Sequence, residues 1–525
     1  LYRKAESTDY IKALSYSLFL KSLSLNETKK ILEVLRATKS DSLKNIFQNW
    51  MAIRSYLSKQ YSSPLSKQTP NIKQKEQQAQ DLEQQLALKS AEYRRYEKSI
   101  DITVKNVYNT LQPNEAAIEF TNFQYYGRNG WTDSTLYAAI ILTKKDTTPH
   151  WVFLFEEKQL KELMGNNVSP NILYSNNKIL PYIKGLKGDM LYNLIWKKIE
   201  PYLVGINTVY YSPSGMLNAV SLAAMPYRGT AMPLCKKYKL LQLGSTKNLA
   251  LPPQQNPVTN IVLMGGITYD ADSSSFAAQT TDTTQLHSNV YTTTILSNTK
   301  SRGGDDYFTT LSATLPEVNS IAKTSEAAGL QATVYSGTAA TEEELKKLSG
   351  NAPSVIHLAT HGFYRSYKKP GRDDMQSTET NFSLIEDPMF RSGVALAGAN
   401  LKWHKNIDVP TRDDGIVTAY DVAQMDLSKT ELVVLSACKS GLGDIDGSEG
   451  VFGLQRGFKS AGVNKMIISL WQVPDKSSME FMTTFYTKWL KEKKDICTAF
   501  YNTQLMMYSK YPNAPQNWAG FILIE

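Results

Sequence analysis

Two apolar runs of the sequence end in residues that can act together as a nucleophile and a base. The run "SVIHLATHG" ends on His361 and Gly362, and the run "ELVVLSACKSG" places Cys438 just after its last apolar residues. A cysteine is a strong nucleophile only as the thiolate, and histidine is the side chain best suited to exchange protons near neutral pH. A single cysteine at the end of a strand is more often a small core residue, and a single His-Gly pair is usually a turn. Both residues, however, occur at the ends of successive core strands, and each is followed by a loop of glycine and polar residues, so a catalytic pair and two structural residues are equal alternatives.

These two runs belong to a series that predicts a mainly parallel sheet. The runs in this series are "NIVLMGG", "ATVYSG", "SVIHLAT", "ELVVLSA", "KMIISLW" and "GFILI". They are apolar almost throughout, which is typical of strands covered by helices on both faces. Reactive groups in such a sheet gather beyond the carboxyl ends of the strands, and adjacent strands lie roughly 5 Å apart. His361 and Cys438 can therefore meet at one edge of the sheet although they are far apart in sequence.

The backbone around these residues offers hydrogen-bond donors for an acyl-transfer reaction. The glycine after His361 lets a carbonyl oxygen approach the backbone N–H of Gly362, and the N–H of Cys438 is the second candidate donor. Donors of this kind stabilise the oxyanion of the intermediate by roughly 3–4 kcal/mol each in well-studied enzymes. The chemistry that this arrangement favours is cleavage of a peptide bond through a thioester.

The hydrophobic periodicity divides the chain into three regions. Residues 1–100 carry apolar positions at helical spacing on a charged background, which predicts an all-helical arm that packs on the main body rather than a free coiled coil. Residues 101–250 alternate short β-rich runs with the amphipathic stretch "MLYNLIWKKIEPYL", which predicts an α/β layer. Residues 251–525 follow the boundary "ALPPQQNP" and form the expected catalytic domain.

The middle region is expected to be an inactive half. It holds a single histidine, His150, and a single cysteine, Cys235. Neither follows a strand in the way that His361 and Cys438 do. We therefore expect this α/β half to support the catalytic domain without a reactive pair of its own.

The composition narrows the classes of partner and cofactor. The chain has 525 residues and a formal net charge of +9, but basic and acidic residues are interspersed, so no groove for nucleic acid is expected. The cysteines and histidines lack zinc spacing, and the loop "GLGDIDGSEG" matches neither a phosphate-binding turn nor a calcium loop, so neither a metal nor a cofactor is expected. No run reaches the roughly 20 apolar residues of a membrane span, and "LYRKAESTDY" lacks a signal-peptide core. We expect a cytoplasmic protein without a membrane partner.

Blocks of the C-terminal region occur in the order found in a known family. They are "HLATHG", "DPMFRSGVALAGAN", "DGIVTAYDVAQMDL", "ELVVLSACKSGLGD", "GSEGVFGLQRGFKSAG", "IISLWQVPD" and "NWAGFILIE". With these blocks, which cover most of residues 250–525, the sequence resembles the CHAT family of caspase-like cysteine peptidases, relatives of separase, gingipain and the metacaspases. The resemblance implies a caspase-like fold with Cys438 as nucleophile and His361 as acid and base. We interpret His357, four residues earlier and inside the strand, as structural.

The resemblance also indicates a residue for substrate specificity. In separase-like relatives an acidic residue beyond the strand that follows the cysteine binds a basic side chain just before the cut. The block "LWQVPD" places Asp475 at the matching position, where a carboxylate would pair with Arg or Lys of the substrate. The alternative is a helix N-cap, because Asp475 immediately precedes the helical stretch "KSSMEFMTTFY".

The function predicted from the sequence is that of a cysteine endopeptidase that cleaves a specific protein partner. The resemblance implies a bacterial defence or regulated-death system and activation by a partner or ligand. The activating protein is expected to dock on the helical arm, or on tetratricopeptide repeats expected before Leu1, because the arm resembles the segment that follows such repeats in bacterial members. The alternative is a catalytically silent caspase-like scaffold that recruits protein partners.

Overall fold

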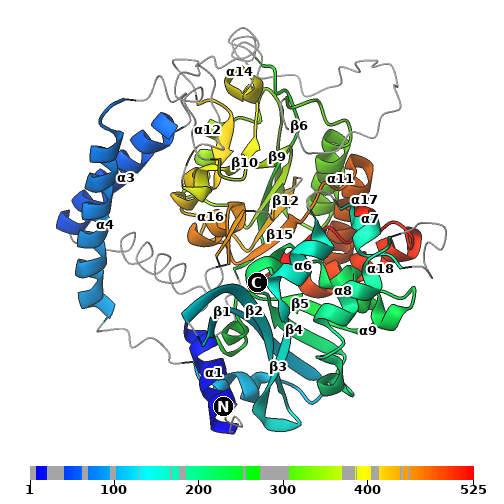
Figure 1. The fold of residues 1–525 in the computed structure, drawn as a ribbon. Helices are drawn as coiled ribbons and strands as arrows, with labels where there is room; N and C mark the ends of the chain where they lie inside the picture. Colours follow the sequence, from blue (N-terminus) through cyan, green and yellow to red (C-terminus); the bar gives the residue numbers. More distant parts are fainter. Residues whose placement is uncertain are drawn as a thin grey trace.

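One large sheet runs through the described part of the chain. The structure, a computed structural model, describes residues 7–20, 41–61, 69–94, 102–128, 130–165, 168–176, 185–251, 256–271, 307–368, 385, 387–403, 413–437, 440–441, 443–446 and 450–525. The sheet has eleven strands in the order β3–β2–β1–β4–β5–β16–β15–β12–β8–β6–β7. Figure 1 shows helices on both sides of its C-terminal strands.

The direction of the strands agrees with the mainly parallel sheet predicted from the apolar runs. The strands are β1 (Glu115–Gly127), β2 (Gly130–Thr143), β3 (Asp146–Glu156), β4 (Thr208–Ser212), β5 (Lys239–Gln242), β6 (Asn260–Ile267), β7 (Gln331–Gly337), β8 (Val355–Ala359), β12 (Leu432–Ser436), β15 (Lys465–Ser469) and β16 (Phe521–Ile524). Only the pairs β1–β2, β2–β3 and β15–β16 of this sheet are antiparallel in the described residues. All other neighbours are parallel, which confirms the predicted fold class.

Helices cover both faces of the C-terminal strands. The first face carries α11 (Thr314–Ala327), α17 (Asp475–Tyr486) and α18 (Ile496–Lys510), and the second carries α12 (Glu342–Lys346), α14 (Ala399–Trp403), α15 (Ala419–Ala423) and α16 (Leu454–Ser460). In β8, Val355 and Ala359 pack in the first core, whereas Ile356 and Leu358 pack in the second. Successive side chains of a strand point to opposite faces. Apart from His357, the side chains on both faces of β8 are therefore apolar, which explains the nearly unbroken apolar run "SVIHLAT".

Strand β16 joins the N-terminal and C-terminal strands into one sheet. It runs antiparallel to β15 and parallel to β5, where Ile524 is paired with Gln242. The backbone N–H of Gly244 also donates to the carbonyl oxygen of Glu525 at 3.0 Å. The apolar run "GFILI" predicts a strand like its neighbours, and its antiparallel pairing with β15 is the exception among the six C-terminal runs.

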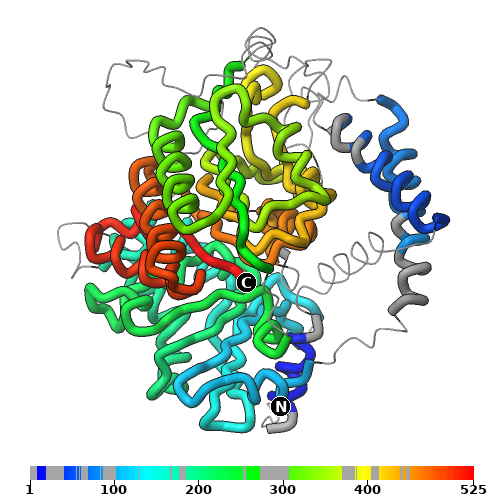
Figure 2. Tube along the Cα trace, turned by 180° about the vertical axis from the view of Figure 1, so that it is seen from behind, coloured from blue at the N-terminus to red at the C-terminus, as the bar shows by residue number. Residues whose placement is uncertain are grey.

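The described helices of the first hundred residues lie in two places. They are α1 (Ser7–Leu20), α3 (Asp41–Tyr61) and α4 (Ile72–Arg94). Helix α1 packs on the N-terminal strands, where Leu14 and Leu18 share a core with Ile140. Helices α3 and α4 pack on each other, and Figure 2 shows this pair beside the C-terminal half and away from α1. A single helical arm, like the boundaries near residues 100 and 250, stays a prediction.

Shorter elements complete the described chain. The helices are α5 (Val104–Thr110), α6 (Glu157–Met164), α7 (Pro170–Leu173), α8 (Gly188–Ile195), α9 (Leu234–Lys237), η2 (Glu200–Leu203), η3 (Gly215–Ala219), η4 (Leu222–Ala224), η5 (Tyr227–Gly229), η6 (Thr246–Ala250), η9 (Pro388–Phe390), η10 (Thr487–Lys491) and η11 (Pro515–Asn517). A small sheet has the order β11 (Ile416–Thr418), β10 (Ser392–Ala395) and β9 (Gly362–Tyr364), and β13 (Asp444–Asp446) pairs with β14 (Gly450–Phe452). Among the described residues, no helix combines the length and the apolar character needed to span a membrane.

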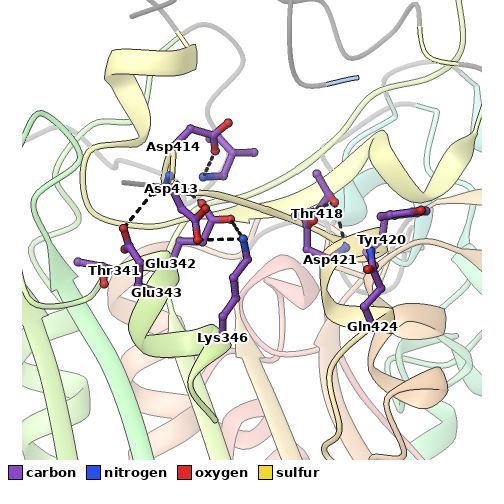
Figure 3. A network of polar contacts seen from close by, with 12 residues as sticks. Thr341, Glu342, Glu343, Lys346, Asp413, Asp414, Thr418, Tyr420, Asp421 and Gln424 are labelled. Carbon is purple, nitrogen blue, oxygen red and sulfur yellow. Dashed lines mark hydrogen bonds and ion pairs between the residues drawn. The ribbon is translucent and has the colours of Figure 1, made fainter. Parts of the chain in front are cut away.

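An acidic network ties helix α12 to the segment before β11 (Figure 3). The carboxylate of Glu342 accepts a hydrogen bond from the backbone N–H of Gly415 at 2.9 Å. The carboxylate of Glu343 accepts one from the N–H of Asp413 at 3.0 Å. Lys346 forms ion pairs with Glu342 at 2.6 Å and with Asp413 at 3.0 Å. Desolvation by burial is the main cause that raises the pKa of Glu342 well above its usual value.

Asp414, in the same network, leads to a prediction on the pH dependence of stability. Burial raises the pKa of Asp414 to about 6, and its Oδ1 accepts a hydrogen bond from the N–H of Ile416 at 2.9 Å. The folded state therefore holds the proton more tightly than the unfolded state, so this group lowers stability as the pH rises from about 4 to about 6. We expect Asp414→Asn, which keeps the acceptor oxygen, to stabilise the protein at neutral pH by on the order of 1 kcal/mol.

Urea unfolding across the acid to neutral range measures this effect. The free energy of unfolding of Asp414→Asn should depend less on pH than that of the wild type. Asp133→Asn, which changes an exposed carboxylate in β2, is the control and should follow the wild type. An Asp414→Asn variant with the wild-type pH dependence would show that the carboxyl of Asp414 ionises as easily in the folded protein as in the unfolded chain.

Candidate active site

The strand register aligns the last residues of the two strands that precede the residues predicted to be catalytic. Strands β8 and β12 are parallel neighbours, and Ala359 is paired with Ser436 at their carboxyl ends. His361 follows Ala359 by two residues, and Cys438 follows Ser436 by two residues in the sequence. Cys438 itself lies outside the described residues. The chain therefore leaves β8 and β12 side by side at the same edge of the sheet.

The ring of His361 is buried and held by a backbone carbonyl. Its Nε2 lies 2.6 Å from the carbonyl oxygen of Thr309. A carbonyl oxygen only accepts hydrogen bonds, so Nε2 carries the hydrogen and Nδ1 is the basic nitrogen of the neutral ring. The rings of Tyr269 and Phe308 lie 5.0 and 5.5 Å from the imidazole, measured between centroids. The histidine is thus fixed in orientation and in tautomer.

Ser469, the last residue of β15, binds the chain on both sides of Cys438. Its hydroxyl donates to the carbonyl oxygen of Ala437 at 2.6 Å, and its backbone N–H donates to Oγ of Ser440 at 3.0 Å. Its carbonyl oxygen accepts from the N–H of Gly441 at 2.8 Å. A Cβ atom at Gly441 would lie only 3.0 Å from that oxygen, so glycine permits the close approach. These bonds anchor the chain before and after the candidate nucleophile to β15.

Gly362 begins the small sheet beside the histidine. It is the first residue of β9 and is paired with Val394 of β10. The carbonyl oxygen of His361 accepts a hydrogen bond from the N–H of Ala395 at 3.0 Å. The backbone on both sides of the His-Gly bond is therefore tied to β10. The role of the Gly362 N–H as an oxyanion donor stays a prediction.

His357 points into the opposite core, away from the sheet edge. Its side chain has no exposed surface, and its Nε2 lies 3.0 Å from Oε1 of Glu317 in α11. Its Nδ1 lies 3.3 Å from the hydroxyl of Tyr486 in α17. A histidine bound on both nitrogens between two helices is a structural residue, in agreement with its interpretation from the sequence.

Asp475 lies where two helices begin. It is the first residue of α17, is 8 % exposed, and accepts a hydrogen bond from the N–H of Ala313 at 2.8 Å. Ala313 directly precedes α11, so the positive ends of both helices face this carboxylate. The segment 309–313 thus runs from the carbonyl that holds His361 to the amide that binds Asp475. The carboxylate binds the start of the neighbouring helix, whereas the alternative drawn from the sequence was a cap of its own helix, and the substrate-binding role of Asp475 stays a prediction.

A buried arginine holds the hairpin that follows the cysteine. Arg391 is 1 % exposed, and its guanidinium binds the carboxylate of Asp444 in β13 through both terminal nitrogens. The hydroxyl of Tyr364 in β9 donates to the same carboxylate at 2.8 Å. Burial is the main cause that raises the pKa of Tyr364 to about 12. Asp444 therefore connects the loop "GLGDIDGSEG" to the strand that follows His361.

The described residues contain no cluster of three or more His, Cys, Asp or Glu side chains arranged to hold a metal ion.

The family model of the CHAT domain matches residues 187–525, which is more than half of the chain. The chain belongs to the CHAT family. The match begins inside the region 101–250, so the CHAT domain includes strands β4 and β5 of the N-terminal part of the sheet.

The proteins and solved structures that are similar to this CHAT protein differ widely in length and identity. Tetratricopeptide repeat protein 28 from Homo sapiens is 30% identical over 207 residues, which are 38% of this chain and 8% of that protein. The Arg-specific cysteine proteinase gingipain R from Porphyromonas gingivalis aligns over 67% of each chain with 9% identity and a TM-score of 0.35. A chain of the Saccharomyces cerevisiae separase–securin complex aligns over 80% of this chain and 30% of its own length, with 10% identity and a TM-score of 0.39. The CHAT protein thus spans a small part of the tetratricopeptide repeat relative.

The two described cysteines of the CHAT protein are poor nucleophiles. Cys235 is fully buried, and desolvation raises the pKa of its thiol to about 12. Cys497 is partly buried, its thiol donates to Oε1 of Glu525 at 3.0 Å, and burial raises its pKa above the usual value. Because the thiolate is the reactive form, neither thiol competes with an activated cysteine for an alkylating reagent.

Sequence reasoning missed three residues around the site. Thr309 acts through its backbone carbonyl, which no side-chain pattern can reveal. Ser469 lies inside the apolar run "KMIISLW", where a serine alone gives no functional signal. Arg391 is the single basic residue in the block "DPMFRSGVALAGAN", and its place beside apolar residues was the signal that could have been used, because an arginine that is buried almost always has a partner.

Proposed function

We propose that this CHAT protein is a cysteine endopeptidase in which Cys438 is the nucleophile and His361 is its acid and base. The observation that carries the proposal is the register between β8 and β12, because it aligns Ala359 with Ser436, two residues before each candidate. In the reaction the sulfur attacks the carbonyl carbon of a peptide bond. The new thioester replaces the C–N bond, and the amine leaves with a proton from the imidazole. Water then hydrolyses the thioester and restores the thiol.

The orientation of the imidazole supports its role as the base. Nε2 donates to the carbonyl of Thr309, so Nδ1 is the nitrogen that takes the proton of the thiol and later gives it to the leaving amine. The backbone N–H groups of Gly362 and Cys438 are the proposed donors to the oxyanion. No cofactor is required for these steps.

Asp475 is the proposed determinant of specificity. A mostly buried carboxylate near the segment that holds His361 is suited to bind Arg or Lys of a substrate just before the cut. We expect Asp475→Asn to reduce kcat/KM for such substrates by roughly tenfold or more, because it removes the charge from a charge-assisted hydrogen bond. The asparagine oxygen can still accept from Ala313, so the melting temperature should change little.

Cleavage-site profiling of wild type and Asp475→Asn with a peptide library tests this role. Asp475→Ala is the comparison variant, because it removes both the charge and the bond to Ala313 and should also lower stability by about 1 kcal/mol. If Asp475→Asn cleaves the same sites at the same rates as the wild type, Asp475 only anchors the two helices.

The proposed activation starts on the helix pair α3–α4. In α3, the guanidinium of Arg54 lies 4.1 Å from the ring centroid of Tyr420 in α15, whose hydroxyl donates to the carbonyl of Arg54 at 3.3 Å. The ring of Tyr420 stacks on Phe390 with centroids 4.1 Å apart. The next residue, Arg391, binds Asp444 in the hairpin after the candidate nucleophile. A protein that displaces α3 would therefore act on the loop after Cys438 through a short series of contacts.

The setting of this activity is part of the same proposal. The substrate is a specific protein, the activator is a protein that docks on the helices before residue 100 or on repeats that precede them, and the system is bacterial defence or regulated cell death in the cytoplasm. The tetratricopeptide repeats named in the human relative support docking between proteins. Neither nucleic acid nor a membrane takes part.

A peptide library and a thiol-reactive peptide aldehyde test the chemistry together. Wild-type protein should cut library peptides at defined sites, and both Cys438→Ala and His361→Ala should abolish the cuts. The aldehyde should modify Cys438 and spare Cys235 and Cys497. Equal modification of all three cysteines, and labelling of Cys438 that persists unchanged in His361→Ala, would instead favour a catalytically silent scaffold.

A further inference from the structure

The side chain of Asn400 binds the backbone of Phe308. This residue directly precedes Thr309, whose carbonyl oxygen holds the ring of His361. Asn400 lies near the start of α14 and is 1 % exposed. Its Oδ1 accepts from the N–H of Phe308 at 3.0 Å, and its Nδ2 donates to the carbonyl oxygen of Phe308 at 3.0 Å. These two bonds give the backbone N–H and carbonyl of Phe308 the partners that a neighbouring strand would otherwise provide.

Further bonds connect Asn400 to the rest of the histidine's surroundings. Nδ2 also donates to Oδ1 of Asp270 at 3.1 Å. The backbone N–H of Asn400 donates to the carbonyl oxygen of Tyr269 at 3.0 Å. Asp270 in turn accepts from the hydroxyl of Tyr307. One buried amide thus holds the segment before Thr309 and the segment of Tyr269 together.

Both segments held by Asn400 touch the ring of His361. Phe308 and Tyr269 pack their rings near the imidazole. Thr309, the residue after Phe308, supplies the carbonyl oxygen at 2.6 Å from Nε2. A shift of the Phe308 backbone moves this oxygen, and with it the hydrogen bond that keeps the proton on Nε2.

We propose that Asn400 is a positioning residue for the proposed catalytic histidine. It fixes the Phe308 backbone, the Thr309 carbonyl follows, and the imidazole keeps Nδ1 as its basic nitrogen. The position requires a donor and an acceptor on one short side chain, which asparagine offers and an ionised aspartate does not. This inference rests on the proposed function, because it acts through His361.

The pH profile of cysteine alkylation tests the inference. The rate at which iodoacetamide modifies Cys438, read by mass spectrometry of the peptide that contains it, should rise at lower pH in the wild type than in His361→Ala, because the imidazolium stabilises the thiolate. Asn400→Asp should shift the profile toward that of His361→Ala and lower the rate at mildly acidic pH by about tenfold. A general loss of stability alone would not move this profile.

Asn176→Asp is the matched control. Nδ2 of Asn176, also buried, donates to the carbonyl oxygen of Thr230 at 2.9 Å and to Oδ1 of Asp189 at 3.2 Å. Asn176→Asp likewise removes a donor to a carbonyl and to a carboxylate, but in the N-terminal part of the chain. The pH profile of Cys438 alkylation should therefore stay that of the wild type. A wild-type profile in Asn400→Asp, beside a shifted one in His361→Ala, overturns the inference and leaves the proposed function intact. If His361→Ala itself keeps the wild-type profile, the proposed function fails.

A measurement on the unaltered protein applies if Asn400→Asp does not fold. Long-range proton–nitrogen NMR spectra of protein with ¹⁵N-labelled histidine distinguish the two tautomers of each ring, and His361→Ala assigns the signal. We expect His361 with its hydrogen on Nε2. A neutral ring with the hydrogen on Nδ1 contradicts the contact through which Asn400 acts and overturns the inference.

Discussion

Replacement of Ser469 by alanine should slow peptide cleavage by on the order of a hundredfold while the protein stays folded. The hydroxyl of Ser469 donates to the carbonyl of Ala437, directly before Cys438. Without this bond the turn is held on one side, by the contacts of Ser440 and Gly441. Displacement of a reacting group by about 1 Å can cost on the order of a hundredfold in rate. The measurement is kcat/KM on the best peptide from the library, with the melting temperature in parallel.

Two further variants distinguish positioning from general destabilisation. Ser469→Thr keeps a hydroxyl and should retain more activity than Ser469→Ala. Ser325→Ala is the control, because Ser325 is buried in α11 and its hydroxyl has no hydrogen-bond partner in the described part of the chain. This control should cleave at the wild-type rate. Equal rates for Ser469→Ala and the wild type would show that the turn needs no side-chain support from β15.

The second large effect is expected for Asp444→Ala, which should destabilise the protein by about 2–3 kcal/mol. The change leaves the guanidinium of Arg391 buried without its counter-charge. Removal of one partner from a buried ion pair typically costs about 3–5 kcal/mol, and the lower value reflects an Asp444 side chain that is 38% exposed. Urea unfolding measures the loss, and hydrogen exchange should show faster opening of β13 and β14.

The double variant Asp444→Ala/Arg391→Met completes this test. It replaces the ion pair with two apolar side chains, so no buried charge is left uncompensated. We therefore expect the double variant to be more stable than Asp444→Ala alone. If the double variant is less stable than either single variant, the arginine contributes mainly through its packing and its bond to the carbonyl of Arg365.

The sequence predicted which runs form strands of the sheet better than it predicted the direction in which each strand runs. The apolar runs report burial on both faces, and burial is the same for a parallel and an antiparallel strand in the middle of a sheet. For this reason the run that forms β16 could be recognised as a strand, but its antiparallel pairing with β15 could not. Its neighbours along the sheet are set by tertiary contacts between segments far apart in the chain.

The candidate site, too, could be predicted only in part from the sequence. His361 and Cys438 could be predicted because their residue types and positions after strands indicate chemistry. The groups that hold the ring of His361 and the chain on either side of Cys438 are a backbone carbonyl at Thr309, a serine in an apolar run and an asparagine near the start of α14. Such residues acquire their roles only when distant segments come together, so their local sequence carries no sign of the role. The catalytic assignments of His361, Cys438, Gly362 and Asp475 stay predictions.

The central place of β16 has a consequence for protein synthesis. This strand joins β5 to β15, yet the ribosome makes it after every other strand of the sheet. Until it emerges, β5 and β15 each have an unpaired edge, which is prone to pair with other chains. β15 also ends in Ser469, which supports the turn of the proposed nucleophile. A nascent chain that lacks β16 therefore has an incomplete sheet beside the proposed site, and we expect the proposed proteolytic activity only after this strand has been made.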